Sequence, residues 1–280
     1  MNNFKIFFFI LTVPLLLSCS KDEDDLDIPL LGLGGDTWVE GPVDVWLYEN
    51  YVVPYNIEVK YRFDSYELAL NKVLVPPMEN KVITVMETIK STWIEPYNQE
   101  AGENFLKELA PKQFVLVGSP EYNDNGTITL GTAEGGLKVV LYKINDFETD
   151  NTAEVKQMLH TIHHEFGHIL HQNIMYPEEF KRITTDYTAS WNDYSLEDAR
   201  SKGYITQYAR SQVDDDFVEM ISIMLIEGKE GFDAIVASTP EDAQVLLRQK
   251  EEIVVSYFKE SWNIDFYNLQ SRTQLAIDAL

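Results

Sequence analysis

Cysteine, histidine and basic residues are all scarce in this sequence. A single cysteine among 280 residues excludes an internal disulfide. Only 22 lysines and arginines stand against 46 aspartates and glutamates, which gives a formal net charge of -24. A surface this acidic argues against nucleic acid as a partner and against direct binding to anionic lipid.

An apolar run lies near the N-terminus, and no later segment of the chain is apolar over the length that is needed to span a membrane. The run over residues 7–17 follows one positive charge and is too short to cross a bilayer, so it has the form of a signal-peptide core. It ends at Leu16-Leu17-Ser18-Cys19, which is typical of a bacterial lipobox, where the cysteine becomes lipidated. The sequence therefore predicts a signal peptide over residues 1–18 and membrane contact through lipidated Cys19 only.

Residues 19–36 are predicted to form a lipidated, acidic and flexible tether, because a polar stretch leads into a segment rich in proline and glycine. Ser20 to Asp25 could be a solvated linker and nothing more. It also resembles the acidic signal that sends some Gram-negative lipoproteins to the outer face of the outer membrane. We therefore predict that the protein is an outer-membrane lipoprotein of a Gram-negative bacterium and that it faces the cell exterior.

The length of the remaining chain suits one large domain or two small ones, and we predict a single domain over residues 37–280. A strand-containing half over 37–150 precedes a helical half over 151–280, so the predicted fold class is α+β. Side-chain alternation and short apolar runs predict strands over Tyr55–Phe63, Phe114–Gly118, Thr127–Leu130 and Leu137–Ile144.

Apolar spacing and capping residues predict the helices. Asn151 or Thr152 is expected to cap a long one, Ser195 a short one, and Asn263 a last one near the C-terminus. The predicted helices cover Asn80–Tyr97, Glu100–Leu109, Asn151–Asn173, Asp214–Glu227 and the segment from Thr239 to Trp262.

All five histidines fall within the helix predicted over Asn151–Asn173, between His160 and His171. Among them is His164-Glu165-Phe166-Gly167-His168, an HExxH motif. Two histidines one turn apart share a helix face and can bind one zinc ion, while the glutamate can act as general base. The alternative is a helix that carries histidines by chance.

Helix geometry separates the candidate ligands. His164 and His168 lie about 6 Å apart along the axis, from where two imidazoles can converge. His164 and His171 lie about 10.5 Å apart, too far for one zinc ion unless the helix breaks between them. We expect His171 and His160 to support the site or line the cleft, with a ligand role as the lesser alternative. His163 is expected at the surface or packed.

The third ligand should come from the helix predicted at Asp214. Asp215 and Glu219 lie four residues apart on one face, and a half-buried carboxylate pair is unfavourable unless a metal or histidine neutralises it. One would bind the metal while the other orients a ligand histidine, and the residues alone leave both assignments open. Asp214 and Asp216 are expected only to favour the helix dipole.

These segments resemble those of a gluzincin. HExxH with Tyr208, Asp215 and Glu219 is similar to the pattern of lethal-factor-type zincins and of the substrate import-associated zinc metallohydrolase lipoproteins, also called putative zinc-binding metallopeptidases. The lipobox and acidic run fit the latter group. The resemblance implies a zincin-like metallopeptidase domain with a small mixed sheet, an HExxH active-site helix and a helical C-terminal half.

The resemblance also implies roles for single residues. Asp215 stands where the family has its third zinc ligand, usually a glutamate, so one zinc ion per chain would be held by His164, His168 and Asp215. Glu219 would then orient a ligand, or replace the shorter Asp215. Tyr208 matches a tyrosine that stabilises the oxyanion.

We therefore expect a zinc-dependent hydrolase, a cell-surface peptidase with Glu165 as general base and a peptide or protein substrate. Leu137–Ile144 would be an edge strand that pairs with the extended substrate. The resemblance implies a nutrient-import system, with an outer-membrane importer and its substrate-binding lipoprotein as partners.

Two alternatives remain. The chain could be a non-catalytic, surface-exposed nutrient-binding lipoprotein with a structural or vestigial metal site, although a structural site needs no Glu165. It could also hydrolyse a non-peptide amide or ester.

Overall fold

The computed structural model describes residues 38–280, except for 65–66, 69–71, 123–127, 130 and 135–137. Residues 40–280 form one compact unit. The predicted signal peptide, Cys19 and the tether over 19–36 lie outside the described residues. Within the described part, none of the helices combines the length and the apolar character that crossing a membrane requires.

The sheet of this unit is small and mixed, and it confirms the predicted fold class. Three short strands run parallel and a fourth pairs antiparallel at one edge, in the order β1-β2-β6-β5. A separate antiparallel pair joins β3 and β4. The strands are β1 (Glu58–Lys60), β2 (Gln113–Leu116), β3 (Glu121–Tyr122), β4 (Ile128–Thr129), β5 (Gly131–Glu134) and β6 (Lys138–Leu141).

The predicted edge strand over Leu137–Ile144 is wrong. It yields β6, which pairs with β2 on one side and with β5 on the other, so it is an interior strand. Its residues Lys138–Leu141 are all buried, as expected for a strand covered on both faces. The strand at that edge is β5, which contacts α7 (Thr152–Asn173).

A helical segment precedes β1 and shortens the predicted strand over Tyr55–Phe63. It comprises α2 (Pro42–Leu47), the π-helical turn η2 (Tyr48–Val52) and α3 (Val53–Tyr55), and it ends at left-handed Asn56. Val43, Leu47 and Tyr51 recur at helical spacing and are buried. The strand is confined to the three residues of β1.

The predicted helix over Asn80–Tyr97 is present and longer than expected. It consists of α4 (Glu79–Ile89), the π-helical turn η3 (Lys90–Ile94) and α5 (Glu95–Ala101). The π-helical turn comes directly before Glu95-Pro96, because a proline lacks the N–H that continues the α-helical ladder. α6 (Glu103–Leu109) follows after Gly102.

The second half is helical, as predicted. Asn151 caps α7 by accepting from the Glu154 N–H, and Ser195 caps α8 by accepting from the Asp198 N–H. The last helix is capped by Asp265 rather than Asn263, which ends the preceding helix in a left-handed conformation. The helices are α7, α8 (Leu196–Ser201), α9 (Val213–Ala237, interrupted at Gly228), α10 (Glu241–Trp262) and α11 (Phe266–Asp278).

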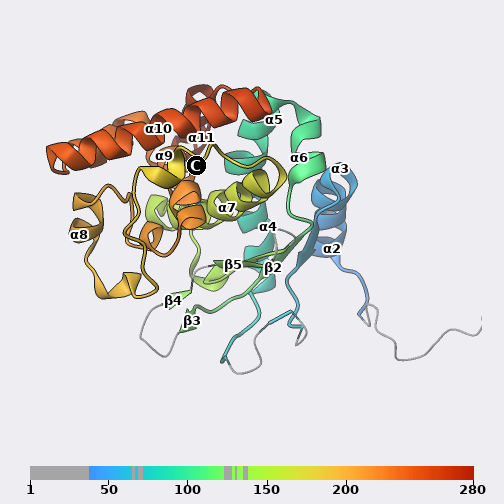
Figure 1. Cartoon of the computed structure of the whole chain (residues 1–280). Coiled ribbons are helices and arrows are strands. Elements are labelled where there is room, and N and C mark those ends of the chain that lie inside the picture. Colours follow the sequence, from blue (N-terminus) through green and yellow to red (C-terminus); the bar gives the residue numbers. More distant parts are fainter. Residues whose placement is uncertain (1–37, 65–66, 69–71, 123–127, 130, 135–137) are drawn as a thin grey trace, which may run out of the picture. The chain divides into compact units, whose positions relative to one another are not determined.

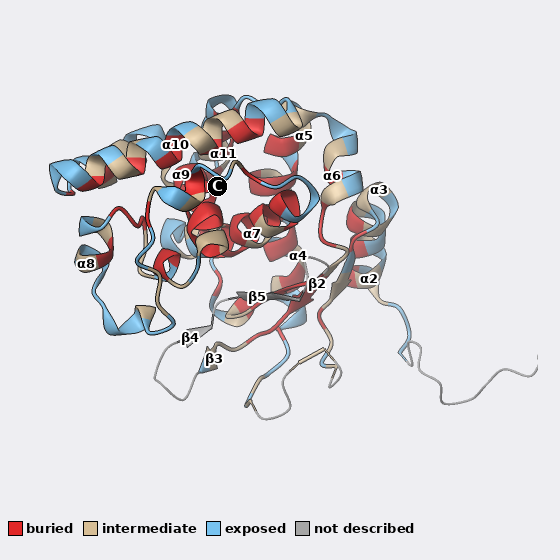
Figure 2. Cartoon of the chain, viewed as in Figure 1, coloured by how far each residue is buried: buried red, intermediate tan, exposed pale blue. Residues whose placement is uncertain are grey.

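The close approach of α7 to α9 is what positions the site. Figure 1 shows α7 between the sheet and the C-terminal helices, and Figure 2 shows buried residues over much of α7 and α9. Gly167 faces Val218, where an added Cβ would lie 2.9 Å from Val218 Cγ1. The glycine inside the HExxH motif therefore lets α9 pack directly against the histidine-bearing helix.

Candidate metal centre

Three side chains from α7 and α9 bring their donor atoms together. His164 Nε2 and His168 Nε2 lie 3.2 Å apart. Asp215 Oδ1 lies 3.3 Å from His168 Nε2 and 3.9 Å from His164 Nε2. His164 and Asp215 are buried and His168 is half-buried. The first turn of α9 thus presents a carboxylate to the two histidines of the motif.

This donor set fits a zinc ion. Bonds of about 2.0–2.1 Å in a tetrahedral site place neighbouring ligand atoms about 3.3 Å apart. The separations of 3.2, 3.3 and 3.9 Å agree with that spacing. Two imidazole nitrogens and one carboxylate oxygen are also a common ligand set for catalytic zinc, with a fourth position left open.

A second cluster nearby consists of His160, His164 and Glu219, and its spacing differs. Glu219 Oε1 lies 2.8 Å from His160 Nε2 and 2.7 Å from His164 Nδ1. These separations are hydrogen-bond lengths and are shorter than the edges of a tetrahedral zinc site. Glu219 therefore contacts the ring edge of His164 opposite to Nε2, away from the position that Asp215 faces.

Glu219 connects the histidines to the loop before α9. Its Oε2 accepts a hydrogen bond from Thr206 Oγ1 at 2.5 Å, and Thr206 Oγ1 accepts from the Ala209 N–H. Burial alone would raise the pKa of Glu219, but His160 and His164 hold it well below the usual range. The carboxylate is thus ionised and fully engaged as an acceptor.

His171 contacts His168, the second ligand candidate, on the ring edge that faces away from the site. Its Nε2 lies 2.9 Å from His168 Nδ1, again on the ring edge opposite to the converging nitrogens. Burial lowers the pKa of His171, which keeps it neutral and able to accept this hydrogen bond. Both His164 and His168 therefore have Nδ1 in a hydrogen bond and Nε2 directed at the site, the arrangement that fixes imidazole ligands in metal sites.

Glu165 is half-buried beside these groups, and its carboxylate makes no hydrogen bond within the described part of the chain. Burial raises its pKa, against the lowering influence of His164 and His168. A carboxylate with a raised pKa and no protein partner is suited to take a proton from a water molecule.

Tyr208 lies beside His164, in the short helical turn η7 (Tyr208–Arg210). Its ring centroid is 5.6 Å from that of His164 and 5.0 Å from that of Trp191. Burial raises its pKa and the charges of Asp215 and Glu165 add to the effect, so the phenol remains a donor. The structure thus places all the predicted metal-site and catalytic residues in one region.

Several supporting residues had no signal in the sequence. Arg210 is 1% exposed and binds Asp198 and Asp186, which secures the turn that carries Tyr208. Asp216 was expected to act only on the helix dipole, and this prediction is wrong, because its side chain is fully buried against Lys250. Such pairs join residues far apart in the chain, and local sequence patterns do not encode them.

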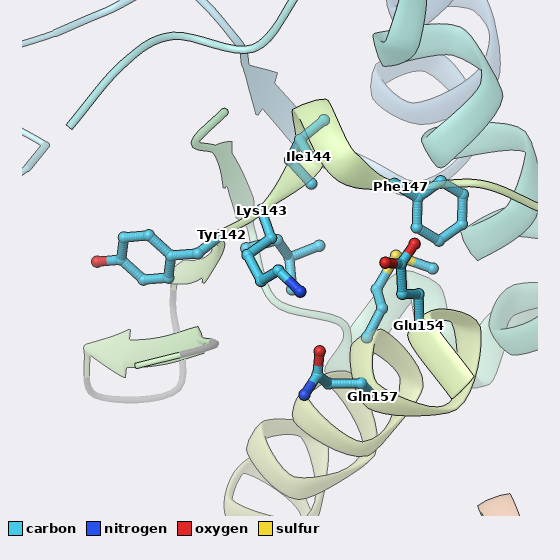
Figure 3. A pocket seen from close by; sticks show the side chains of 8 residues that line it. Tyr142, Lys143, Ile144, Phe147, Glu154 and Gln157 are labelled. Carbon is cyan, nitrogen blue, oxygen red and sulfur yellow. The ribbon is translucent and has the colours of Figure 1, made fainter. Parts of the chain in front are cut away.

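A small pocket lies beside the N-terminal part of α7, the helix that also carries Glu165 (Figure 3). Gln157, Thr161 and Glu165 are spaced four residues apart, so they share one helix face. From Gln157 to Glu165 the distance along the axis is about 12 Å. The pocket is lined by Leu141, Tyr142, Lys143, Ile144, Phe147, Glu154, Gln157 and Met158.

Comparison with known proteins agrees with this geometry. Residues 36–267 match the family model described as putative zinc-binding metallo-peptidase. The chain is also similar to the crystal structure of a putative zinc-binding metallo-peptidase from Bacteroides caccae, with 33% identity and a TM-score of 0.73. That match covers 85% of this chain and 93% of the other. No curated protein matches the chain.

Proposed function

Since this chain belongs to the family of putative zinc-binding metallo-peptidases, we propose that it hydrolyses peptide bonds with one zinc ion held by His164, His168 and Asp215. The observation that carries the proposal is the convergence of His164 Nε2, His168 Nε2 and Asp215 Oδ1 at separations of 3.2–3.9 Å. Bound there, zinc would polarise the scissile carbonyl and make a water molecule more acidic.

The chain's own residues supply the proton transfers. Glu165, whose pKa is raised by burial, takes the proton from the attacking water and passes it to the leaving amine. Tyr208 donates a hydrogen bond to the oxyanion, since its raised pKa keeps the phenol protonated. Glu219 and His171 hold the two ligand rings through Nδ1.

An extended substrate would pair with β5, which replaces the wrongly predicted edge strand. β5 pairs with β6 on one side and contacts α7, the helix that carries Glu165. Backbone hydrogen bonds to a sheet edge hold a peptide without demanding a particular sequence. The substrate would then run along the α7 face that leads to the pocket of Figure 3.

Substitution of Glu165 tests this function. Glu165→Gln should keep one zinc ion per chain by elemental analysis, and its activity on a peptide library should fall about a hundredfold or more. Tyr208→Phe should lower kcat without altering zinc content, and His168→Leu should lose the metal. Full activity in Glu165→Gln, or a purified wild-type chain without stoichiometric zinc, would overturn the proposal.

We also propose that this peptidase is anchored at the cell surface and serves nutrient import, beside an outer-membrane importer and its substrate-binding lipoprotein. The support is the lipobox that ends at Cys19 and the acidic run that follows it. Cys19→Ser should release the protein from the membrane fraction. Protease added to intact cells should digest the wild-type protein if it faces the exterior, and its protection would contradict the outer-face location.

A further inference from the structure

The first turn of α9 carries three consecutive aspartates whose side chains have different partners. Asp214 accepts a hydrogen bond from Tyr176 OH, and Asp215 faces His168 in the metal centre. Asp216 points away from the metal centre into the interior, where it is 0% exposed. The aspartate next to the proposed zinc ligand is therefore an internal contact of the fold.

Asp216 is held by a buried lysine. Lys250 Nζ lies 2.5 Å from Asp216 Oδ2, and both side chains are 0% exposed. Thr184 Oγ1 and Tyr187 OH donate to the same oxygen, each at 3.0 Å. Oδ1 of Asp216 has no partner within the described part of the chain. All the hydrogen bonds to this carboxylate thus act on one oxygen, from the side of α10 and of the 184–187 segment.

Lys250 connects three parts of the unit. It belongs to α10, pairs with Asp216 of α9, and donates a second hydrogen bond to the Gly203 carbonyl at 2.8 Å. Its ammonium group lies 4.6 Å from the ring centroid of Tyr204, which adds a cation–π contact. The start of α9 is thereby fixed to α10 and to the loop after α8.

Stability alone does not account for such a pair. Removing two charges from water is unfavourable, and apolar side chains of similar volume often serve stability as well or better. The pair can instead serve to fix the position of the first turn of α9. Within the described part of the chain, the N-cap residue Gln212 makes no side-chain capping hydrogen bond, so the first turn of α9 lacks that usual anchor. Asp215 is short, so the place of its carboxylate depends on the backbone of this turn, while Ser211 Oγ, one residue before the N-cap, donates a hydrogen bond to its Oδ2.

We propose that Lys250 and Asp216 are positioning residues, which fix the first turn of α9 so that Asp215 Oδ1 faces Nε2 of His164 and His168, where these three residues would hold zinc. This inference rests on the proposed zinc site. It predicts that the pair controls metal affinity although neither side chain contacts the metal centre.

Zinc affinity of the folded chain is the decisive measurement, made by chelator competition well below the unfolding temperature. Lys250→Met and Asp216→Asn should each weaken zinc binding about tenfold or more. Loss of a group that orients the ligands has an effect of this size in other metal sites. Leu106→Ala is the matched control, because it truncates a fully buried side chain in α6. It should lower the unfolding temperature and leave the zinc Kd unchanged.

The double variant separates position from stability. Asp216→Asn with Lys250→Met removes both charges, so the metal-free protein should regain much of the unfolding temperature that either single change lowers. Its zinc affinity should remain weakened, since the link between α9 and α10 is gone. Tyr187→Phe removes one hydrogen bond from Asp216 and should weaken zinc binding about two- to fivefold. If Lys250→Met or Asp216→Asn does not fold, the zinc affinity of Tyr187→Phe tests the inference instead.

The outcomes are distinct. Wild-type zinc affinity in the folded double variant and in Tyr187→Phe would overturn this inference and leave the proposed function standing. An equal loss of affinity in Leu106→Ala would also overturn it, because general destabilisation would then explain the effect. A wild-type chain that binds no zinc would overturn the proposed function and this inference together.

Discussion

Glu219 Oε1 accepts a hydrogen bond from His164 Nδ1 at 2.7 Å, on the ring edge opposite to Nε2. The ionised carboxylate can only accept, so Nδ1 carries the proton and the lone pair of Nε2 is free for a metal. His160 and Thr206 donate to the same carboxylate and hold it in place. One buried glutamate therefore sets both the tautomer and the orientation of a proposed zinc ligand.

Glu219→Gln should weaken zinc binding about tenfold or more and leave a stoichiometric site. The amide can still occupy the position, but it loses the charge that strengthens the hydrogen bond from His164. Asp215→Ala should weaken binding further, because it removes a proposed ligand. Chelator competition measures both constants. The reverse order, with Glu219→Gln losing the metal and Asp215→Ala keeping it, would make Glu219 the third ligand.

Gln157→Trp should reduce activity on long peptides more than on short ones. Gln157 is exposed at the pocket of Figure 3, about 12 Å along α7 from Glu165, which an extended peptide spans in about four residues. A bulky side chain there would raise KM for substrates that reach the pocket. Gln157→Ala is the control and should leave the length preference unchanged. Equal effects on long and short peptides would exclude the pocket from the substrate path.

His163→Leu should raise the free energy of unfolding by about 1 kcal/mol. His163 is 1% exposed beside Tyr97, and neither of its ring nitrogens has a hydrogen-bond partner among the residues that the structure describes. Leucine of similar volume removes two unpaired polar atoms without opening a cavity. His163→Ala should instead destabilise the protein, because it leaves a void. Denaturant unfolding measures both, and a destabilised leucine variant would indicate an unseen partner for the imidazole.

Asp44→Asn should lower stability at pH 7 by about 1 kcal/mol, with the difference shrinking in acid. Arg62 forms two hydrogen bonds to Asp44, and this pairing holds the pKa of the carboxyl well below its usual range. Because the folded-state pKa lies below the unfolded value, the stabilisation is complete above about pH 4 and is lost as pH falls further.

Denaturant unfolding of wild-type and Asp44→Asn protein from pH 7 to pH 3 checks this expectation. Glu40→Gln is a neighbouring control, since Glu40 has no side-chain hydrogen bond or ion pair within the described residues. A stability difference that stays constant with pH would show that the Asp44 charge is not its source.

Local features of the site could be read from the sequence because they depend on neighbouring residues. Asn151 caps α7 within one turn, and the spacing of His164 and His168 places both rings on one face of the helix. The helix predicted over Asp214–Glu227 is interrupted directly after Glu227, at Gly228, where φ is positive. The choice between Asp215 and Glu219 stayed open, since both lie on the same face of α9.

The sequence by itself determined the HExxH motif on α7, the proposed general base Glu165 within it, and the α+β class, because helix periodicity and strand patterns are short-range properties. Only the tertiary structure decided that Asp215 faces Nε2 of the ligand rings while Glu219 faces Nδ1 of His164. It also decided that β5, and not β6, lies at an edge of the sheet, and that Lys250 contacts the start of α9 through Asp216. These contacts join segments far apart in the chain, so they depend on how the helices pack and not on any local pattern.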